Sequence, residues 1–219
     1  MRIGILLDLD GTLLDTLQDL TDSVNHALEQ FGCPARTSQE IRSYLGFGVT
    51  HLLKSALPGE TEDPELSRVL EIYKDYYAGH NCVKTAPYPG ILEAMAVLGK
   101  TYPLGIVSNK HHGAVVPICQ HFFGEDIYAL GETGDCPRKP APDMLLKAMA
   151  DLGVEGCVYV GDSEVDLETA KNANVPCLSV TWGFRDEDVL KAAGAKEICI
   201  SPEKLAEQLI EMVETYYGQ

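Results

Sequence analysis

Short apolar runs alternate along the chain with helix-like segments, and this alternation constrains the fold more than any other feature. Segments with a helical pattern span 91–98, 114–121, 142–152, 164–172 and 204–216, while the apolar runs span 3–7, 103–107, 127–130, 157–160, 176–180 and 198–200. Runs of this length without polar alternation are typical of strands that are buried on both faces. Repeated strand-then-helix units predict an α/β fold with a doubly wound parallel sheet, which is a Rossmann-like core.

One long interval interrupts this alternation. Residues 15–80 carry a charged, helical pattern without a convincing strand, and the pattern is broken at points rich in Gly and Pro. So much chain exceeds what one crossover connection needs. We therefore expect an inserted small helical cap domain over 15–85, with the core formed by residues 1–14 and 86–219.

The charge balance of the chain restricts its partners. The sequence has 17 Lys and Arg residues against 33 Asp and Glu residues, a formal net charge of −16. Such a field repels phosphate backbones and anionic lipid headgroups, so we expect no nucleic-acid and no membrane partner. The apolar runs are far shorter than the roughly 20 residues of a membrane span. Seven scattered cysteines without CxxC spacing are typical of reduced thiols, so we expect a cytoplasmic protein without a targeting segment.

Four polar motifs fall at the carboxyl ends of predicted strands, and the first, which directly follows the strand at 3–7, is Asp8-Leu9-Asp10-Gly11-Thr12. Its two carboxylates are two residues apart and can share one face. Such a pair is tolerated when a cation lies between the acids or when one stays protonated, which suits a metal-bound nucleophile beside a general acid. Gly11 lets the backbone approach an anion, and Thr12 can cap the turn. A simple Asp-Gly turn after a strand is the alternative interpretation.

The second and third motifs supply groups that suit phosphate oxygens. Ser108 and Asn109 follow the strand at 103–107 and offer a hydroxyl, an amide and backbone N–H donors. Capping of the next helix is the alternative interpretation of this pair. Lys139 precedes Pro140, and an extended segment before proline gives its ammonium a defined place. A solvated lysine before a helix is the alternative here.

The fourth motif, at residues 161–166, puts Asp162 at a strand end and Asp166 one helical turn further on. Carboxylate oxygens at this position favour Mg²⁺. Ser163 and Asp166 also match a capping box, which would only start a helix. All four motifs fall at the carboxyl ends of predicted strands, where open α/β sheets bind ligands, so we expect them to form one site.

In this order the motifs resemble those of the haloacid dehalogenase-like phosphohydrolase superfamily: an Asp-x-Asp signature, a Ser or Thr, a Lys, and a Gly-Asp-x-x-x-Asp acidic motif. The resemblance covers essentially the whole chain, and the insert is similar to the small helical cap of that superfamily. Residues 8–16 and 41–48 most resemble phosphoglycolate phosphatase-like enzymes. Asp10 distinguishes the chain from the dehalogenases, which lack the second Asp. Thr12 differs from the aliphatic residue common in sugar phosphomutases.

The resemblance implies a Mg²⁺-dependent phosphomonoester hydrolase that acts on a small phosphorylated metabolite such as phosphoglycolate. Asp8 would attack phosphorus and form an aspartyl-phosphate, while Asp10 would act as general acid and then as general base. Mg²⁺ would be held by the Asp8 carboxylate, the Asp10 backbone carbonyl and Asp162, with Asp166 orienting these ligands. The phosphate oxygens would be bound by Ser108, Asn109, Lys139, Gly11 and Thr12.

Four residues of the insert are candidates for contacting the leaving group: Arg42, Tyr44, Phe47 and Lys54. Solvated helix charges and packing between cap helices are their alternative interpretations. Three other functions stay open at this point: a sugar phosphomutase, a pyrophosphatase or 5′-nucleotidase on the same core, and a non-catalytic binding protein. The sequence pattern favours no particular oligomeric state.

Overall fold

The computed structural model describes residues 1–59 and 63–218 of the 219-residue chain. The chain forms two compact units, one made of Met1–Leu14 with Pro87–Gln219 and the other of Asp15–Ala86. Two short strands, β2 (Leu14–Asp15) and β3 (Ala86–Pro87), form a two-stranded sheet at the points where the chain passes between the units. The smaller unit is thus an insertion that directly follows the first strand and its loop.

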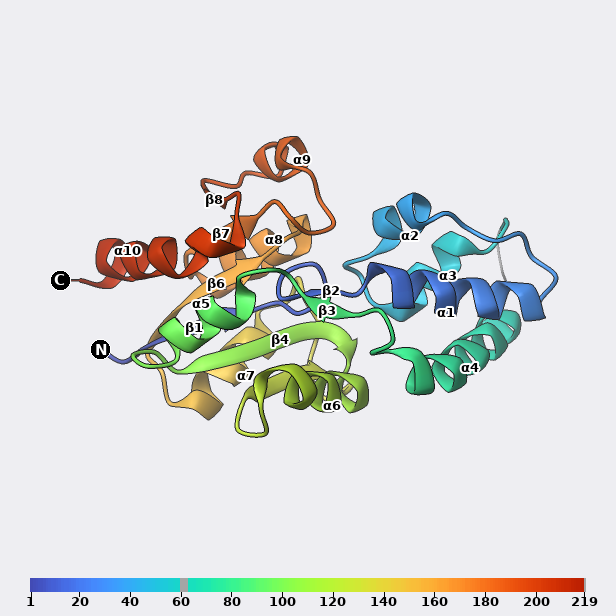
Figure 1. Cartoon of the computed structure of the whole chain (residues 1–219), viewed down its shortest axis with the longest axis horizontal. Helices are drawn as coiled ribbons and strands as arrows, with labels where there is room; N and C mark the ends of the chain where they lie inside the picture. The colour runs from blue at the N-terminus through green and yellow to red at the C-terminus, as the bar shows by residue number, and fades with distance from the viewer. Residues whose placement is uncertain (60–62, 219) are drawn as a thin grey trace. The chain divides into compact units, whose positions relative to one another are not determined.

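The larger unit contains a six-stranded parallel sheet in the order β5-β4-β1-β6-β7-β8 (Figure 1). The chain builds one half of this sheet outward from β1 and then returns to build the other half from β6. β1 and β6 are neighbours in the sheet, but each begins a different half. A crevice therefore forms between their carboxyl ends. The strands are β1 (Ile3–Leu7), β4 (Leu104–His111), β5 (Tyr128–Glu132), β6 (Gly156–Gly161), β7 (Cys177–Val180) and β8 (Glu197–Cys199).

Helices cover both faces of this sheet, which explains the uninterrupted apolar character of β1. Ile5 and Leu7 pack in one hydrophobic cluster with α5, α6 and α10, while Leu6 points to the opposite face and packs with α7 and α8. The α/β fold with a doubly wound parallel sheet is therefore confirmed. The helices are α5 (Ile91–Leu98), α6 (His112–Phe123), α7 (Asp143–Leu152), α8 (Glu164–Ala173), α9 (Glu187–Ala192) and α10 (Leu205–Tyr217), with a 3₁₀ turn at Pro202–Lys204.

Between the strand residues at its two ends, the described elements of the smaller unit are helices: α1 (Leu17–Gln30), α2 (Ser38–Tyr44), α3 (Val49–Ala56) and α4 (Asp63–His80). The longest two helices, α1 and α4, pack against each other. A capping box starts α2, in which Glu40 N donates to Thr37 Oγ1 and Thr37 N donates to Glu40 Oε2. In the parts of the chain that the structure describes, no helix is long and apolar enough to cross a membrane.

Strand β4 differs from its prediction in a way that matters for the site. It continues to His111, so Ser108 and Asn109 lie inside the strand and not beyond its end. The pairing of β4 with β5 shifts register between Val107 and His111. Irregularities of this kind leave residues unpaired and re-aim their side chains. Ser108 and Asn109 can therefore lie within the strand and still face its carboxyl edge.

Candidate active site

The first motif forms a tight loop at the end of β1. Asp8 N donates to Val160 O of the neighbouring strand at 2.9 Å, and Gly11 N donates to Leu14 O at 2.9 Å. Gly11 has a φ of +84°, and a side chain there would collide with the Asp162 carboxylate. The glycine therefore serves the site by leaving space for Asp162, while its own N–H closes the loop.

Three buried carboxylates meet at the crevice between β1 and β6. Asp8 follows β1, Asp162 follows β6, and Asp166 lies in the first turn of α8. One oxygen of each lies within 4.8 Å of the others, an arrangement that could hold a metal ion. Carboxylate oxygens are the ligands of hard divalent cations, so these residues fit such a cation. We call Asp8, Asp162 and Asp166 the acidic cluster.

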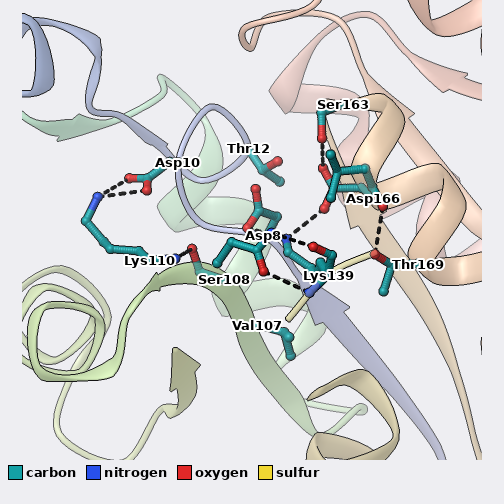
Figure 2. A network of polar contacts seen from close by, with 12 residues as sticks. Asp8, Asp10, Thr12, Val107, Ser108, Lys110, Lys139, Ser163, Asp166 and Thr169 are labelled. Atoms are coloured by element: carbon teal, nitrogen blue, oxygen red, sulfur yellow. Dashed lines mark hydrogen bonds and ion pairs between the residues drawn. The ribbon is translucent and has the colours of Figure 1, made fainter. Parts of the chain in front are cut away.

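Lys139 is the ammonium group in contact with the acidic cluster (Figure 2). Its Nζ lies 2.8 Å from Asp8 Oδ1 and 2.8 Å from Asp166 Oδ1, and it donates to the Tyr159 hydroxyl at 2.9 Å. The Asn109 amide holds the backbone of Lys139 at both polar atoms, because Nδ2 donates to Lys139 O and Oδ1 accepts from Lys139 N, each at 2.9 Å. The lysine is thus fixed at its backbone and at its tip.

Negative charge outweighs positive charge in this buried region. Burial raises the pKa of Asp8 to about 7, although Lys139 opposes this effect. Burial, together with the Asp166 and Asp8 carboxylates, raises the pKa of Asp162 well above its usual value. Burial disfavours the charged form of Lys139, but Asp166 and Asp8 outweigh this and raise its pKa. Binding of a cation among the three carboxylates would relieve their mutual repulsion.

The second carboxylate of the first motif has a different partner. Both oxygens of Asp10 lie 2.7 Å from Lys110 Nζ, and Figure 2 shows the pair to one side of the acidic cluster. Asp8 and Asp10 therefore contact one lysine each, Lys139 for the first and Lys110 for the second.

Hydroxyl groups complete the surroundings of the cluster. Thr12 Oγ1 lies 3.4 Å from Asp162 Oδ1, and Ser108 Oγ is buried and accepts from Lys110 N at 3.2 Å. Ser163 Oγ donates to Asp166 Oδ2 at 2.6 Å and makes no bond to a helix N–H. The capping-box interpretation of Ser163 and Asp166 is therefore wrong, because the hydroxyl orients the carboxylate instead.

Three contacts at the site were not predicted from the sequence. Lys110 adjoins the predicted pair Ser108 and Asn109, but nothing in its position indicates that it meets Asp10. Tyr159 belongs to an apolar run and is fully buried, yet its hydroxyl donates to Asp166 Oδ1 at 3.0 Å. Phe184 N donates to Asp162 Oδ2 at 2.6 Å from the loop after β7.

The candidate leaving-group residues all belong to the smaller unit. Arg42 and Tyr44 belong to α2, Phe47 lies in the loop that follows, and Lys54 belongs to α3. Lys54 is exposed, and the other three are half-buried. Phe47 contacts the His51 ring with a centroid separation of 5.1 Å.

Comparison with known proteins identifies relatives that agree with one another in family and in named activity. The model of the haloacid dehalogenase-like hydrolase family matches residues 5–180. Phosphoglycolate phosphatase from Mesorhizobium japonicum is 32% identical over 200 residues, covering 84% of this chain and 85% of that protein. The enzyme from Cereibacter sphaeroides is 34% identical over 192 residues, covering 85% and 88%. A crystal structure assigned as a phosphoglycolate phosphatase from Lactobacillus delbrueckii subsp. bulgaricus superposes with a TM-score of 0.86 at 38% identity, covering 94% and 97%.

Proposed function

Because the chain belongs to the haloacid dehalogenase-like hydrolases and is a phosphatase of that family, we propose that it hydrolyses phosphoglycolate with Mg²⁺ through an aspartyl-phosphate. The observation that carries this proposal is the buried acidic cluster, with Lys139 bonded to its Asp8 and Asp166 members at the carboxyl end of the sheet. Such a surplus of carboxylates suits the joint binding of a cation and a phosphate ester.

Asp8 is the proposed nucleophile. Its carboxylate oxygen attacks phosphorus in line with the ester oxygen, forming the P–O bond of an aspartyl-phosphate as the bond to the leaving alkoxide breaks. Asp10 gives a proton to that alkoxide. It then takes a proton from the water that attacks phosphorus and releases inorganic phosphate, which restores the Asp8 carboxylate.

The cation and the surrounding groups have separate tasks in this proposal. Mg²⁺ bound by Asp8, the Asp10 carbonyl and Asp162 would neutralise charge between the nucleophile and the phosphate oxygens. Asp166, held by Ser163 and Tyr159, orients the neighbouring groups. Groups for the phosphate oxygens are supplied by Ser108 and Asn109 of β4, by Lys139, and by the loop residues Gly11 and Thr12.

Phosphoglycolate is the proposed substrate because the relatives at 32% and 34% identity over most of the chain are phosphoglycolate phosphatases. Its leaving group carries a carboxylate, which Arg42 and Lys54 are suited to bind, while Tyr44 and Phe47 suit its apolar edge. We also propose a cytoplasmic location, since none of the seven cysteines, all of them in the described part of the chain, is in a disulfide.

Steady-state phosphate release tests this proposal. Phosphoglycolate is compared with sugar phosphates, nucleotides and pyrophosphate, each with MgCl₂ and with EDTA, and Asp8→Asn serves as the inactive control. Metal-dependent turnover with kcat/KM for phosphoglycolate at least about tenfold above the rest of the panel is expected. Equal activity across the panel would remove the substrate assignment. Phosphoryl transfer to a sugar hydroxyl would identify a mutase, and a wild type no more active than Asp8→Asn would identify a binding protein.

A further inference from the structure

We propose that Lys110 is a positioning residue for Asp10, whose carboxylate it holds in the orientation needed for proton transfer to and from the reacting oxygens. This inference rests on the proposed function, in which Asp10 is the general acid and base. It assigns a task to a lysine that does not belong to the predicted phosphate-binding set.

The contact between the two side chains fixes the direction in which the Asp10 carboxylate points. Lys110 Nζ is equidistant from both oxygens, at 2.7 Å from each. A single donor so placed lies close to the line that bisects the carboxylate, which leaves the outer lone pairs of the oxygens free for other partners. The exposed fractions of the two side chains are 8% for Lys110 and 19% for Asp10. Partial burial of this kind strengthens the ion pair relative to one on the surface.

Contacts with Ser108 and with strand β5 hold the backbone around Lys110. Lys110 N donates to Ser108 Oγ, and Gly131 N on β5 donates to His112 Nδ1 at 3.1 Å. A Cβ on Gly131 would lie 2.6 Å from Lys110 O, so the two strands approach more closely here than any side chain allows. The register shift between Val107 and His111 falls on the same segment. Packing and strand irregularity together aim the lysine at the loop that carries Asp10.

The orientation of Asp10 matters because its carboxyl group transfers a proton twice, first to the leaving alkoxide and then from the attacking water. The two oxygen atoms lie at nearly the same place. A proton is transferred efficiently only when donor and acceptor lie within hydrogen-bond reach. A displacement of about 1 Å can lower the rate about 100-fold. Without Lys110, the Asp10 side chain would sample other rotamers and spend only part of its time in the reactive orientation.

The test compares Lys110→Met and Lys110→Arg with the wild type, and Lys147→Met is the matched control. Lys147 also pairs with an aspartate, Asp151 at 2.9 Å, but on the exposed surface of α7. We expect Lys110→Met to lower kcat for phosphoglycolate by about 10- to 100-fold with KM within about twofold of the wild type. Lys110→Arg should recover part of the loss, and Lys147→Met should match the wild type.

Hydrolysis of p-nitrophenyl phosphate distinguishes a role in positioning Asp10 from a purely structural role of Lys110. Its leaving group needs no proton, so Lys110→Met should keep the wild-type rate of the initial p-nitrophenolate burst while the following steady-state rate falls. In an Asp10→Asn background, Lys110→Met should cause no further loss, because the lysine acts through Asp10. A fall in the burst rate, an additive double mutant, or a raised KM with unchanged kcat would each overturn the proposal.

The two proposals fail in different ways. If the wild type hydrolyses phosphoglycolate and Lys110→Met retains its full kcat, only the role of Lys110 is wrong. If the wild type is inactive on every ester while binding Mg²⁺, both are wrong. Thermal melting of Lys110→Met and Lys110→Arg identifies a folding defect. If Lys110→Met is poorly folded, the kcat of Lys110→Arg is compared with that of the wild type instead.

Discussion

Asp19 in the smaller unit and the acidic cluster in the larger unit are both buried, but they differ in their hydrogen-bond donors. Asp19 accepts from the backbone N–H groups of Val83, Lys84 and Thr85 and from the Thr85 hydroxyl, at 2.8 to 3.0 Å. The cluster places three carboxylates within 4.8 Å of one another, and Lys139 pairs with two of them, Asp8 and Asp166. Asp19 fixes the segment 83–85 to α1, whereas the cluster holds acids that repel each other.

This difference separates a structural carboxylate from a functional one. A buried carboxylate that is surrounded by N–H and O–H donors stabilises the folded chain without any ligand. Carboxylates that face one another destabilise the free protein and gain from a bound cation. An uncompensated charge, more than burial itself, therefore distinguishes the functional site. Removing one carboxylate from each region by mutation tests this conclusion.

The largest effect should come from Asp8→Asn. Loss of the nucleophile is expected to lower phosphate release at least about 10³-fold. The free energy of unfolding should stay equal or rise, because one of three mutually repelling carboxylates is gone. Phosphate release and urea denaturation measure the two quantities, and substantial residual turnover or a marked loss of stability would contradict the distinction drawn above.

Asp19→Ala should have the opposite profile. Four donors lose a charged acceptor, and two of them, the N–H and the hydroxyl of Thr85, are buried, so the free energy of unfolding is expected to fall by about 3 kcal/mol. Asp22→Ala is the matched control, since Asp22 is partly exposed and pairs with Lys84 at 2.8 Å. That surface pair should contribute less than about 1 kcal/mol. Equal losses in the two variants, measured by urea denaturation, would show that the donors around Asp19 add nothing.

The pH dependence of stability should also distinguish the cluster. The folded-state pKa of Asp8 is about 7, above the unfolded value, so the folded protein retains a proton that the unfolded chain has lost. The contribution of Asp8 to stability should therefore fall as the pH rises from about 4 to about 7, at up to about 1.4 kcal/mol per pH unit. In EDTA, Asp8→Asn should gain stability relative to the wild type over this window and run parallel to it above. Parallel curves throughout would argue that Asp8 is already compensated.

Metal binding should produce the smallest of these effects, a rise in Tm. A ligand at ten times its Kd stabilises a protein by about 1.4 kcal/mol, which corresponds to a rise of about 3–6 °C in Tm for a chain of this size. Saturating MgCl₂ should raise the Tm of the wild type and of Asp22→Asn, but not of Asp162→Asn. An unchanged response in Asp162→Asn would place the cation elsewhere.

Much of the fold was predictable because strands buried on both faces need an unbroken apolar run. The run at 3–7 became β1 and the segment at 91–98 became α5 with the predicted bounds. The meeting of Asp8 and Asp162 follows the same logic, since parallel strands align their carboxyl ends at one edge. Lys139 reaches the same edge from the segment between β5 and α7.

Contacts between distant side chains were not predictable. Asp10 and Lys110 lie 100 residues apart, and no periodicity of the sequence links them. Lys110 lies within the register shift of β4, which no local pattern of residues indicates. Tyr159 is similar, because its aromatic ring fits the apolar run while its hydroxyl contacts Asp166 and Lys139.

The saturation of Lys139 has a consequence for product release. An ammonium group has three hydrogens, and those of Lys139 already have oxygen partners on Asp8, Tyr159 and Asp166. A phosphate oxygen must therefore displace one of these partners before it can bond to the lysine. Each new bond replaces an old one, so the net gain in affinity is small. Inorganic phosphate should consequently inhibit the enzyme only weakly, and turnover can continue as the product accumulates.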